Sequence, residues 1–246
     1  MLIVQPAQPN RIRDMMRFLT IFAPLWLTSL AFAQQEYVSR FDAFAGYALL
    51  DSPHIGLVEN GFAAQIGVRP RTWFSVGFDY SNTGGDTVLT PDLLTTSLQQ
   101  TLGAILAQLA AAGRLPSGYV VRVPIHSRTH TFAVGPQLAF RHWRHETVFF
   151  RPLFAGAIYE QATPKATDPI TSAIVSQLAP SGKKTDTTWF LGLGGGFDVL
   201  PTKHFAVRTQ VDVVYDHLFN DLLRDGRWTV RFSIGPAFNF GRNIQH

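Results

Sequence analysis

The stretch that decides the fold lies near the end of the chain: Trp228-Thr-Val-Arg-Phe-Ser-Ile-Gly-Pro-Ala-Phe-Asn-Phe240. Every second residue, beginning with Trp228, is large and apolar or is proline. The residues between them are small or polar and include Arg231 and Asn239. Because successive side chains of a β-strand point to opposite faces, this stretch predicts one apolar and one polar face. That pattern is typical of a strand that crosses a membrane, with lipid outside and a polar lumen inside.

The same alternation recurs seven times earlier in the chain. With the stretch 228–240 it gives eight predicted strands, and bacterial outer-membrane barrels have an even number. Short turns are expected after the second, fourth and sixth strands. Longer loops are expected after the odd-numbered strands, and 81–128 and 161–188 are the longest of these. Such asymmetry between the two sides of the membrane is expected of an outer-membrane barrel. The seven earlier stretches are 41–49, 62–68, 73–80, 129–140, 148–159, 189–199 and 205–215.

A soluble lipocalin-like barrel also alternates, so other features must identify the outer face. The lysines all fall in predicted loops or turns, whereas a soluble barrel needs a charged outer surface. Four tyrosines close the odd-numbered strands, and Trp189 and Trp228 open descending strands at the same level, as in the aromatic girdle of a membrane interface. These features favour the membrane barrel. The tyrosines are Tyr47, Tyr80, Tyr159 and Tyr215, and a second girdle is predicted at Phe41, Phe74, Phe140, Phe149, Phe205 and Phe240.

Residues 16–33 predict a secretory signal peptide, with a basic start at Arg17, an apolar run, and Ala31-Phe-Ala33 as a small-x-small cleavage site. The alternative is a transmembrane helix, but the run is too short to span a bilayer comfortably. We therefore expect residues 1–33 to be cleaved after Ala33 and residues 34–246 to form one barrel domain.

The chain has no cysteine, so we expect neither disulfides nor thiolate metal sites. Without residues 1–33 the chain keeps 18 of its 21 basic and 16 of its 17 acidic residues, and this net charge of about +2 is too small to indicate nucleic-acid binding.

These features together give an all-β prediction: an eight-stranded antiparallel up-and-down transmembrane β-barrel with helical segments in the long external loops. The chain resembles the eight-stranded outer-membrane barrels, namely the OmpA-like transmembrane domain and the broader porin-like group. The resemblance rests on the strand count, the loop asymmetry and the glycine-bearing terminal strand. An internal repeat supports it, because Phe132-Ala-Val-Gly-Pro-Gln-Leu-Ala-Phe140 has the same spacing of Phe, Gly-Pro and Phe as Phe232–Phe240.

The resemblance implies a place in the outer membrane of a Gram-negative cell envelope. It also implies contact with outer-membrane lipid, insertion by the barrel assembly machinery, and a monomer. The chain departs from the family pattern at its end. Family chains commonly finish on an aromatic residue that the assembly machinery reads, whereas here six residues follow Phe240. The terminal signal would therefore have to be read internally.

Seven charged residues on the polar faces of the predicted strands should point into the lumen. Eight strands enclose only enough space for side chains to fill, so we expect these charges to pair in an interior network. The alternative is a gated conduit in which they form the gate. Gly192, Gly194 and Gly196 share one strand face, which favours lumen positions that leave room for bulky neighbours over a nucleotide-binding loop. The seven are Asp42, Asp79, Arg151, Asp198, Arg208, Asp212 and Arg231.

Two loop segments predict helices. The first starts at Thr90-Pro91 and stops at Gly113, and the second starts at Asp168-Pro169. We expect both helices to pack over the external mouth of the barrel. The apolar stripe of the first helix then serves either to bury itself against the second helix and the rim, or to present a partner-binding or lipid-contacting surface. That stripe consists of Leu94, Leu98, Leu102, Ile105 and Leu109.

The sequence predicts a non-enzymatic barrel that contributes to envelope integrity or to surface interaction through its long loops. A narrow pore, or a barrel that binds a small solute or lipid, is the alternative, and a lipid A-modifying enzyme is the second. His126 and Ser127 are adjacent, so an extended strand points them to opposite faces, and no nearby carboxylate completes a triad. Histidines near the mouth suit a metal or pH-sensing role or are merely solvated. We predict no catalytic residue, metal site, cofactor or nucleic-acid partner.

Overall fold

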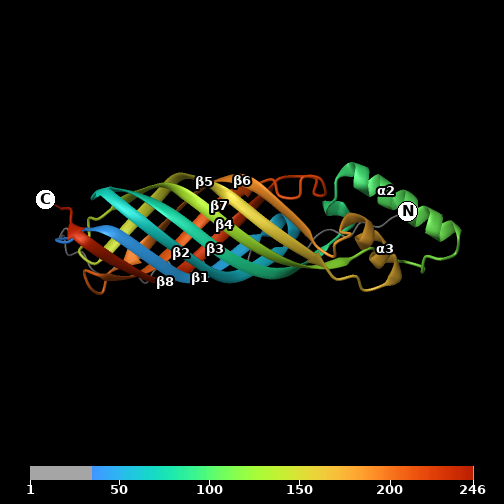
Figure 1. Ribbon diagram of the computed structural model, residues 1–246, viewed down its shortest axis with the longest axis horizontal. Coiled ribbons are helices and arrows are strands. Elements are labelled where there is room, and N and C mark those ends of the chain that lie inside the picture. Colours follow the sequence, from blue (N-terminus) through green and yellow to red (C-terminus); the bar gives the residue numbers. More distant parts are fainter. Residues whose placement is uncertain (1–34, 246) are drawn as a thin grey trace. The chain divides into compact units, whose positions relative to one another are not determined.

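The computed structural model describes residues 35–245, and the predicted signal peptide lies outside them. The described residues form a closed antiparallel barrel in which consecutive strands pair and β1 closes the sheet against β8 (Figure 1). This confirms the predicted eight-stranded up-and-down architecture. The strands are β1 (Ser39–Ser52), β2 (Leu57–Arg71), β3 (Phe74–Leu89), β4 (Val123–Phe140), β5 (Glu146–Pro164), β6 (Lys184–Val199), β7 (Phe205–Asp216) and β8 (Arg227–Asn243).

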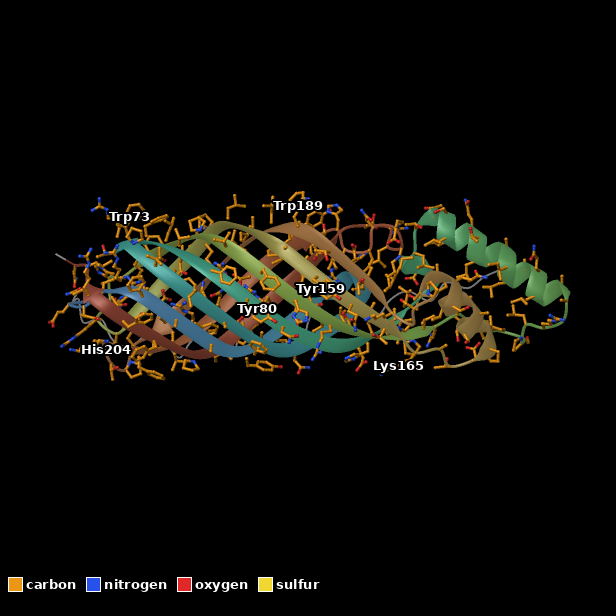
Figure 2. The ribbon with its side chains drawn as sticks, in the orientation of Figure 1. Trp73, Tyr80, Tyr159, Lys165, Trp189 and His204 are labelled. Atoms are coloured by element: carbon orange, nitrogen blue, oxygen red, sulfur yellow. The ribbon has the colours of Figure 1, made fainter. Side chains whose placement is uncertain are left out.

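The outer wall of the barrel carries a belt of exposed apolar side chains. On β6, Trp189, Leu191 and Leu193 expose 70%, 43% and 50% of their surface, while the residues between them point inward. Aromatic residues bound this belt, and Figure 2 shows Tyr80 and Trp189 well separated along the barrel axis from Trp73 at the other end. Water-soluble monomers rarely leave an apolar surface of this extent uncovered. Hydrocarbon is therefore the medium that this wall faces.

The aromatic residues at the loop end of the belt pack against one another on the outer wall. Ring centroids of Tyr215 and Trp228 lie 4.8 Å apart. Tyr80 lies 5.0 Å from Phe132 by the same measure, and its hydroxyl shares a hydrogen bond of 2.9 Å with His130 Nδ1. Amphipathic rings with a polar tip suit the boundary between lipid and water. The predicted girdle therefore has a structural counterpart at this end.

A β-bulge in β5 explains why the alternation of the fifth predicted strand is unclear. The pairing of β5 shifts register against both neighbours here, and Pro152 and Leu153 are both exposed. An extra residue of this kind changes the phase of the strand. Phe149 was predicted for the outer girdle, and this is wrong. Its side chain lies in the lumen on the same face as Arg151, where Gly196 leaves room for the ring.

The strands continue past the aromatic level on the loop side, farther than predicted. β3 reaches Leu89 and β4 begins at Val123, and the two stay paired to their ends. Outward residues in these extensions, such as Asn82 and Arg128, are polar. The apolar alternation therefore stops although the ladder goes on. The predicted loops 81–128 and 161–188 are correspondingly shorter. The connection between β1 and β2 is no long loop, because it holds only the short 3₁₀ helix η2 (Pro53–Ile55) and one glycine.

Candidate functional site

The first group of buried charges centres on Arg208 of β7. Its Nε and Nη2 donate to the two oxygens of Asp198 at 2.8 and 2.9 Å, and Nη2 lies 2.9 Å from Asp42 of β1. A further bond of 2.7 Å runs from Nη1 to Gln65 Oε1. The guanidinium also lies 5.0 Å from the ring centroid of Phe149. A buried cation needs partners of this number because it has lost its water.

The second group joins Arg151 of β5 and Arg231 of β8 through Asp212 of β7. Nη2 of Arg231 donates to Asp212 at 2.6 Å, and Nη1 of Arg151 lies 3.3 Å from both of its oxygens. Arg151 also pairs with Asp79 of β3 and stacks 4.1 Å from the Phe154 ring centroid. Two cations thus face two carboxylates. The structure places all seven charged residues predicted for the lumen inside it, each in an ion pair.

Arg69 belongs to the first group, although the sequence analysis assigned it to a turn. It is buried, pairs with Asp42 at 3.3 Å, and donates to Asn239 Oδ1 at 3.0 Å. The predicted strand 62–68 ends at Val68, whereas β2 runs to Arg71. The signal was present, because Arg69 continues the inward period-two face that carries Gln65.

A third polar group, which the sequence analysis missed, lies inside the strand extensions. Arg227 of β8 pairs with Glu160 of β5 at 2.6 Å and with Asp216 of β7 at 3.0 Å. Glu59 of β2 is buried beside them. Period two carried back from Arg231 would have found Arg227. Hydroxyl groups complete the set by donating to the two glutamates, and they come from Thr83, Ser127 and Thr129.

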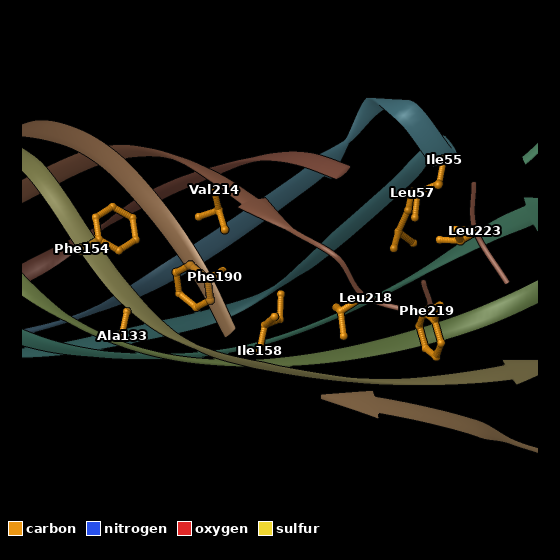
Figure 3. Close-up of a cluster of buried hydrophobic side chains, with 10 residues drawn as sticks. All are labelled: Ile55, Leu57, Ala133, Phe154, Ile158, Phe190, Val214, Leu218, Phe219 and Leu223. Carbon is orange, nitrogen blue, oxygen red and sulfur yellow. The ribbon is translucent and has the colours of Figure 1, made fainter. Parts of the chain in front are cut away.

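Apolar side chains fill the lumen between the second and third groups. Along β5, the inward residues Phe154 and Ile158 lie between Arg151 and Glu160, and both are fully buried. Figure 3 shows them in a file with Phe190 that continues toward Leu218 and Phe219 at the loop end. The second and third polar groups are thus separated by a mainly apolar segment. An ion that entered from either end would meet both fixed charges and a hydrocarbon plug.

Three glycines of β6 make this filling possible. A Cβ atom built on Gly192 would collide with the Phe154 ring, one on Gly194 with Asp212, and one on Gly196 with the Phe149 ring. Each glycine therefore leaves space for a large lumen side chain, which is the role that their period-two spacing predicts.

Two helices lie at the loop end of the barrel, α2 (Thr96–Ala111) and α3 (Pro169–Leu178) (Figure 1). The predicted start of the first helix at Thr90 is wrong. Thr90-Pro91 opens only the 3₁₀ helix η3 (Pro91–Leu93), after which Leu94 is held extended by a β-bridge to Leu223. An α-helix cannot begin before this constraint ends. Gly113, with φ +64°, lies just beyond the end of α2, as predicted.

The five residues of the predicted stripe do not share one environment. Leu94 lies before the helix and is buried, as is Leu102, and Leu98 packs partly buried against their cluster. Ile105 and Leu109 instead line a groove that α3 closes from the other side. The first three serve the packing of the cap, while the last two lie where the helices meet solvent.

An apolar cavity of about 110 Å³ lies beneath the two helices. Its walls come from α2, α3, the ends of β3, β4 and β5, and the connection between β7 and β8. Glu160 of the third polar group lines it, as does Phe219 from the end of the apolar file. The cap, defined here as residues 90–122 and 165–183, therefore covers a partly open space above the lumen.

Asp168 fixes the start of α3. Its Oδ1 accepts from the backbone N–H groups of Ile170 and Thr171 at 2.9 and 3.0 Å, and the Thr171 hydroxyl completes a capping box. Tyr119 donates its hydroxyl to Asp168 at 2.9 Å. The Thr171 N–H holds the pKa of Asp168 below its usual 3.8. Burial and the bond to Asp168 raise the pKa of Tyr119 to about 12, so that hydroxyl keeps its proton at neutral pH.

Replacing Asp168 by Ala is expected to release the first turn of α3, because two backbone donors lose their acceptor. Amide hydrogen exchange at Ile170 and Thr171 should speed up, while Asp168→Asn, which keeps a cap, should change it far less. The depressed pKa means that the carboxylate stabilises the folded cap above its ordinary value of 3.8. That contribution is lost as pH falls through the lower folded value. Equal exchange in both variants would contradict the capping role.

The residues weighed for catalysis do not come together. Ser127 is buried and donates to Glu160 at 2.8 Å, while His126 lies on the opposite face of β4, 3.0 Å from exposed Asp86. In residues 35–245 no set of three or more His, Cys, Asp or Glu side chains is placed to hold a metal ion. Neither α2 nor α3 has the length and apolarity of a membrane-spanning helix.

Comparisons with known proteins find likenesses among solved structures only. No protein-family model matches the chain, and no curated protein matches it. The Yersinia pestis attachment invasion locus protein Ail is 12% identical, with a TM-score of 0.46 over 82% of this chain and 99% of Ail. OprG of Pseudomonas aeruginosa is 11% identical, with a TM-score of 0.46 over 85% of this chain and 99% of OprG. Neisserial surface protein A is 14% identical, with a TM-score of 0.42 over 81% and 96%.

The assignment of the fold rests on the molecule's own construction. The sheet closes without an edge, its outer wall is apolar between two aromatic levels, and its long connections lie at one end. Only helices and closed barrels satisfy their backbone in hydrocarbon. In architecture the chain is a closed, eight-stranded, up-and-down β-barrel whose outer wall is built to face the hydrocarbon of a membrane.

Proposed function

We propose that this protein is a non-conducting, non-enzymatic outer-membrane barrel that acts at the cell surface through its helical cap. The observation that carries the proposal is the filled lumen, in which three polar groups and an apolar file occupy the bore. Such an interior supports a barrel that serves as an anchor rather than a path. The ordered cap is the part of the molecule left free to meet an external partner. We also propose that the mature chain begins at Gln34.

Two measurements test whether the protein conducts ions and whether it modifies lipid A. Purified protein in planar lipid bilayers should give no discrete conductance steps, because buried ion pairs and a file of buried apolar side chains fill the lumen. Regular steps would overturn the anchor and restore the narrow-pore reading. Lipid A from cells that produce the protein should keep the mass of lipid A from cells without it. A gain or loss of one acyl chain would identify an enzyme.

The surface role is tested by removing the cap and keeping the barrel. A variant with residues 91–119 and 166–182 replaced by short Gly-Ser linkers leaves all membrane-spanning strand segments intact. Heat-dependent migration on a gel checks that it folds. In a strain that lacks the protein, the full chain should restore attachment of the cells to a surface that carries the external partner. The cap-deleted chain should not restore it.

The second candidate function is envelope integrity, which the closed and heavily ion-paired barrel favours. The same strains distinguish it from the surface role. Sensitivity to detergents and to large antibiotics reports on the envelope independently of attachment. If the cap-deleted chain restores every defect as well as the full chain does, the barrel alone carries the function. The surface proposal is then wrong.

A further inference from the structure

The cavity beneath the cap is lined almost wholly by apolar side chains. α2 supplies Leu102, α3 supplies Ile174 and Val175, the end of the cap segment 90–122 supplies Val121, and β4 supplies Val123. These residues belong to a buried cluster that also joins the cap to the barrel. The cavity, which is partly open to its surroundings, is therefore lined by separately anchored segments.

The charged residues that line the cavity are already engaged. Glu160 accepts from Ser127 at 2.8 Å and pairs with Arg227 at 2.6 Å, below the cavity. Lys184 pairs with Asp221 on the outer side. A ligand in the cavity would therefore meet hydrocarbon walls and no charge in need of a partner.

We propose that this cavity binds a small, uncharged, apolar molecule of about the size of one aromatic ring. Its volume of about 110 Å³ compares with an engineered cavity of roughly 150 Å³, which has Leu, Ile and Phe walls, stays dry and binds benzene. Water is a poor occupant because it would find too few hydrogen-bond partners. The acyl chain of a lipid is too large, and the cavity lies beyond the aromatic level that marks the edge of the hydrocarbon.

The backbone conformation of Phe219, which forms one wall of the cavity, indicates a binding site and not a packing defect. Phe219 has φ +54° and is the one non-glycine residue of 35–245 with a positive φ. Its N–H is held by the Asp186 carboxylate, and its carbonyl accepts from Leu222 and Leu223 at 2.8 and 2.7 Å. Bulky residues rarely adopt this conformation, and strain of this kind gathers at binding sites. Here it holds the buried ring against the cavity.

The experiment must separate binding in the cavity from partition into detergent or lipid. Folded protein with ¹³C-labelled methyl groups in lipid nanodiscs is titrated with benzene and followed by NMR. Methyl signals of Ile174 and Val121 should shift and saturate. Signals of Leu191 and Leu193, which face lipid, should drift without saturation. If the cavity methyls drift in the same way as the lipid-facing ones, the proposal is overturned.

A matched pair of variants locates the site. Ala162→Phe fills the cavity from β5, whereas Ala157→Phe makes the same change on the lipid face of the same strand. Ala162→Phe should abolish the saturable shifts, and Ala157→Phe should keep them. Ala179→Leu, from the far wall, replaces Ala162→Phe if that variant does not fold. Saturable shifts that survive in whichever cavity-filling variant folds would place the ligand elsewhere and overturn the assignment.

Discussion

Replacing Arg208 by Met should lower the free energy of unfolding by about 3 to 5 kcal/mol, the range expected when one partner of a buried ion pair is removed. The physical reason is that Asp42 and Asp198 remain buried without the cation that they share. Methionine fills similar space, so the loss reports on charge more than on volume. Urea unfolding in phospholipid vesicles, followed by tryptophan fluorescence, measures the effect.

Two further variants control this experiment. Arg128→Met makes the same change on the exposed outer face of β4 and should leave stability within about 0.5 kcal/mol of the parent. Adding Asp198→Asn to Arg208→Met should recover much of the loss, because Asp42 then stays paired with Arg69 and this group holds no uncompensated charge. If the single variant is no less stable than Arg128→Met, the lumen network does not hold the barrel together.

Replacing Leu193 by Arg should destabilise the barrel by about 2 to 4 kcal/mol, as expected for a cation at the bilayer midplane. Leu193 lies on the lipid face of β6, half exposed, well below Trp189. The guanidinium would have to leave water for hydrocarbon, since no lumen carboxylate lies on that face. Unfolding in vesicles is again the measurement.

Thr187→Arg is the matched control, because it changes the same face of the same strand on the other side of Trp189. Its side chain meets water, so the expected change is about 0 to 1 kcal/mol. Equal effects at the two positions would mean that no boundary between lipid and water lies at the aromatic level. The membrane assignment would then fail.

The sequence predicts the membrane-spanning part well because hydrocarbon on one side and a polar lumen on the other impose a contrast. For this reason alone, Trp228 predicts the lipid-facing side of its strand and Arg231 predicts the lumen side. Above the aromatic level both sides of the wall are polar. Outward residues such as Asn82 and inward residues such as Glu59 are then both polar, so the alternation that marks a strand is lost. The predicted strands therefore end too early. The third charged group was missed for the same reason.

Other features depend on contacts between segments far apart in the chain. Nothing local to Leu94 reveals that Leu223 will hold it extended and delay the helix. The cavity likewise cannot be predicted from the sequence, because its walls come from α2, α3, the ends of three strands and the connection between β7 and β8. The start of α3 was predictable, since Asp168-Pro169 carries its own capping chemistry. The sequence therefore predicts the features that neighbouring residues determine.

The continuation of the strands past the aromatic level raises the helices away from the bilayer. β4 runs on from His130 back to Val123, and at about 3.3 Å per residue this adds on the order of 20 Å along the strand. The hairpins thus form a stalk above the lipid. Gly113 is exposed at the far end of α2, and exposed tips tolerate insertions. An epitope tag placed there should be stained by antibody on intact cells.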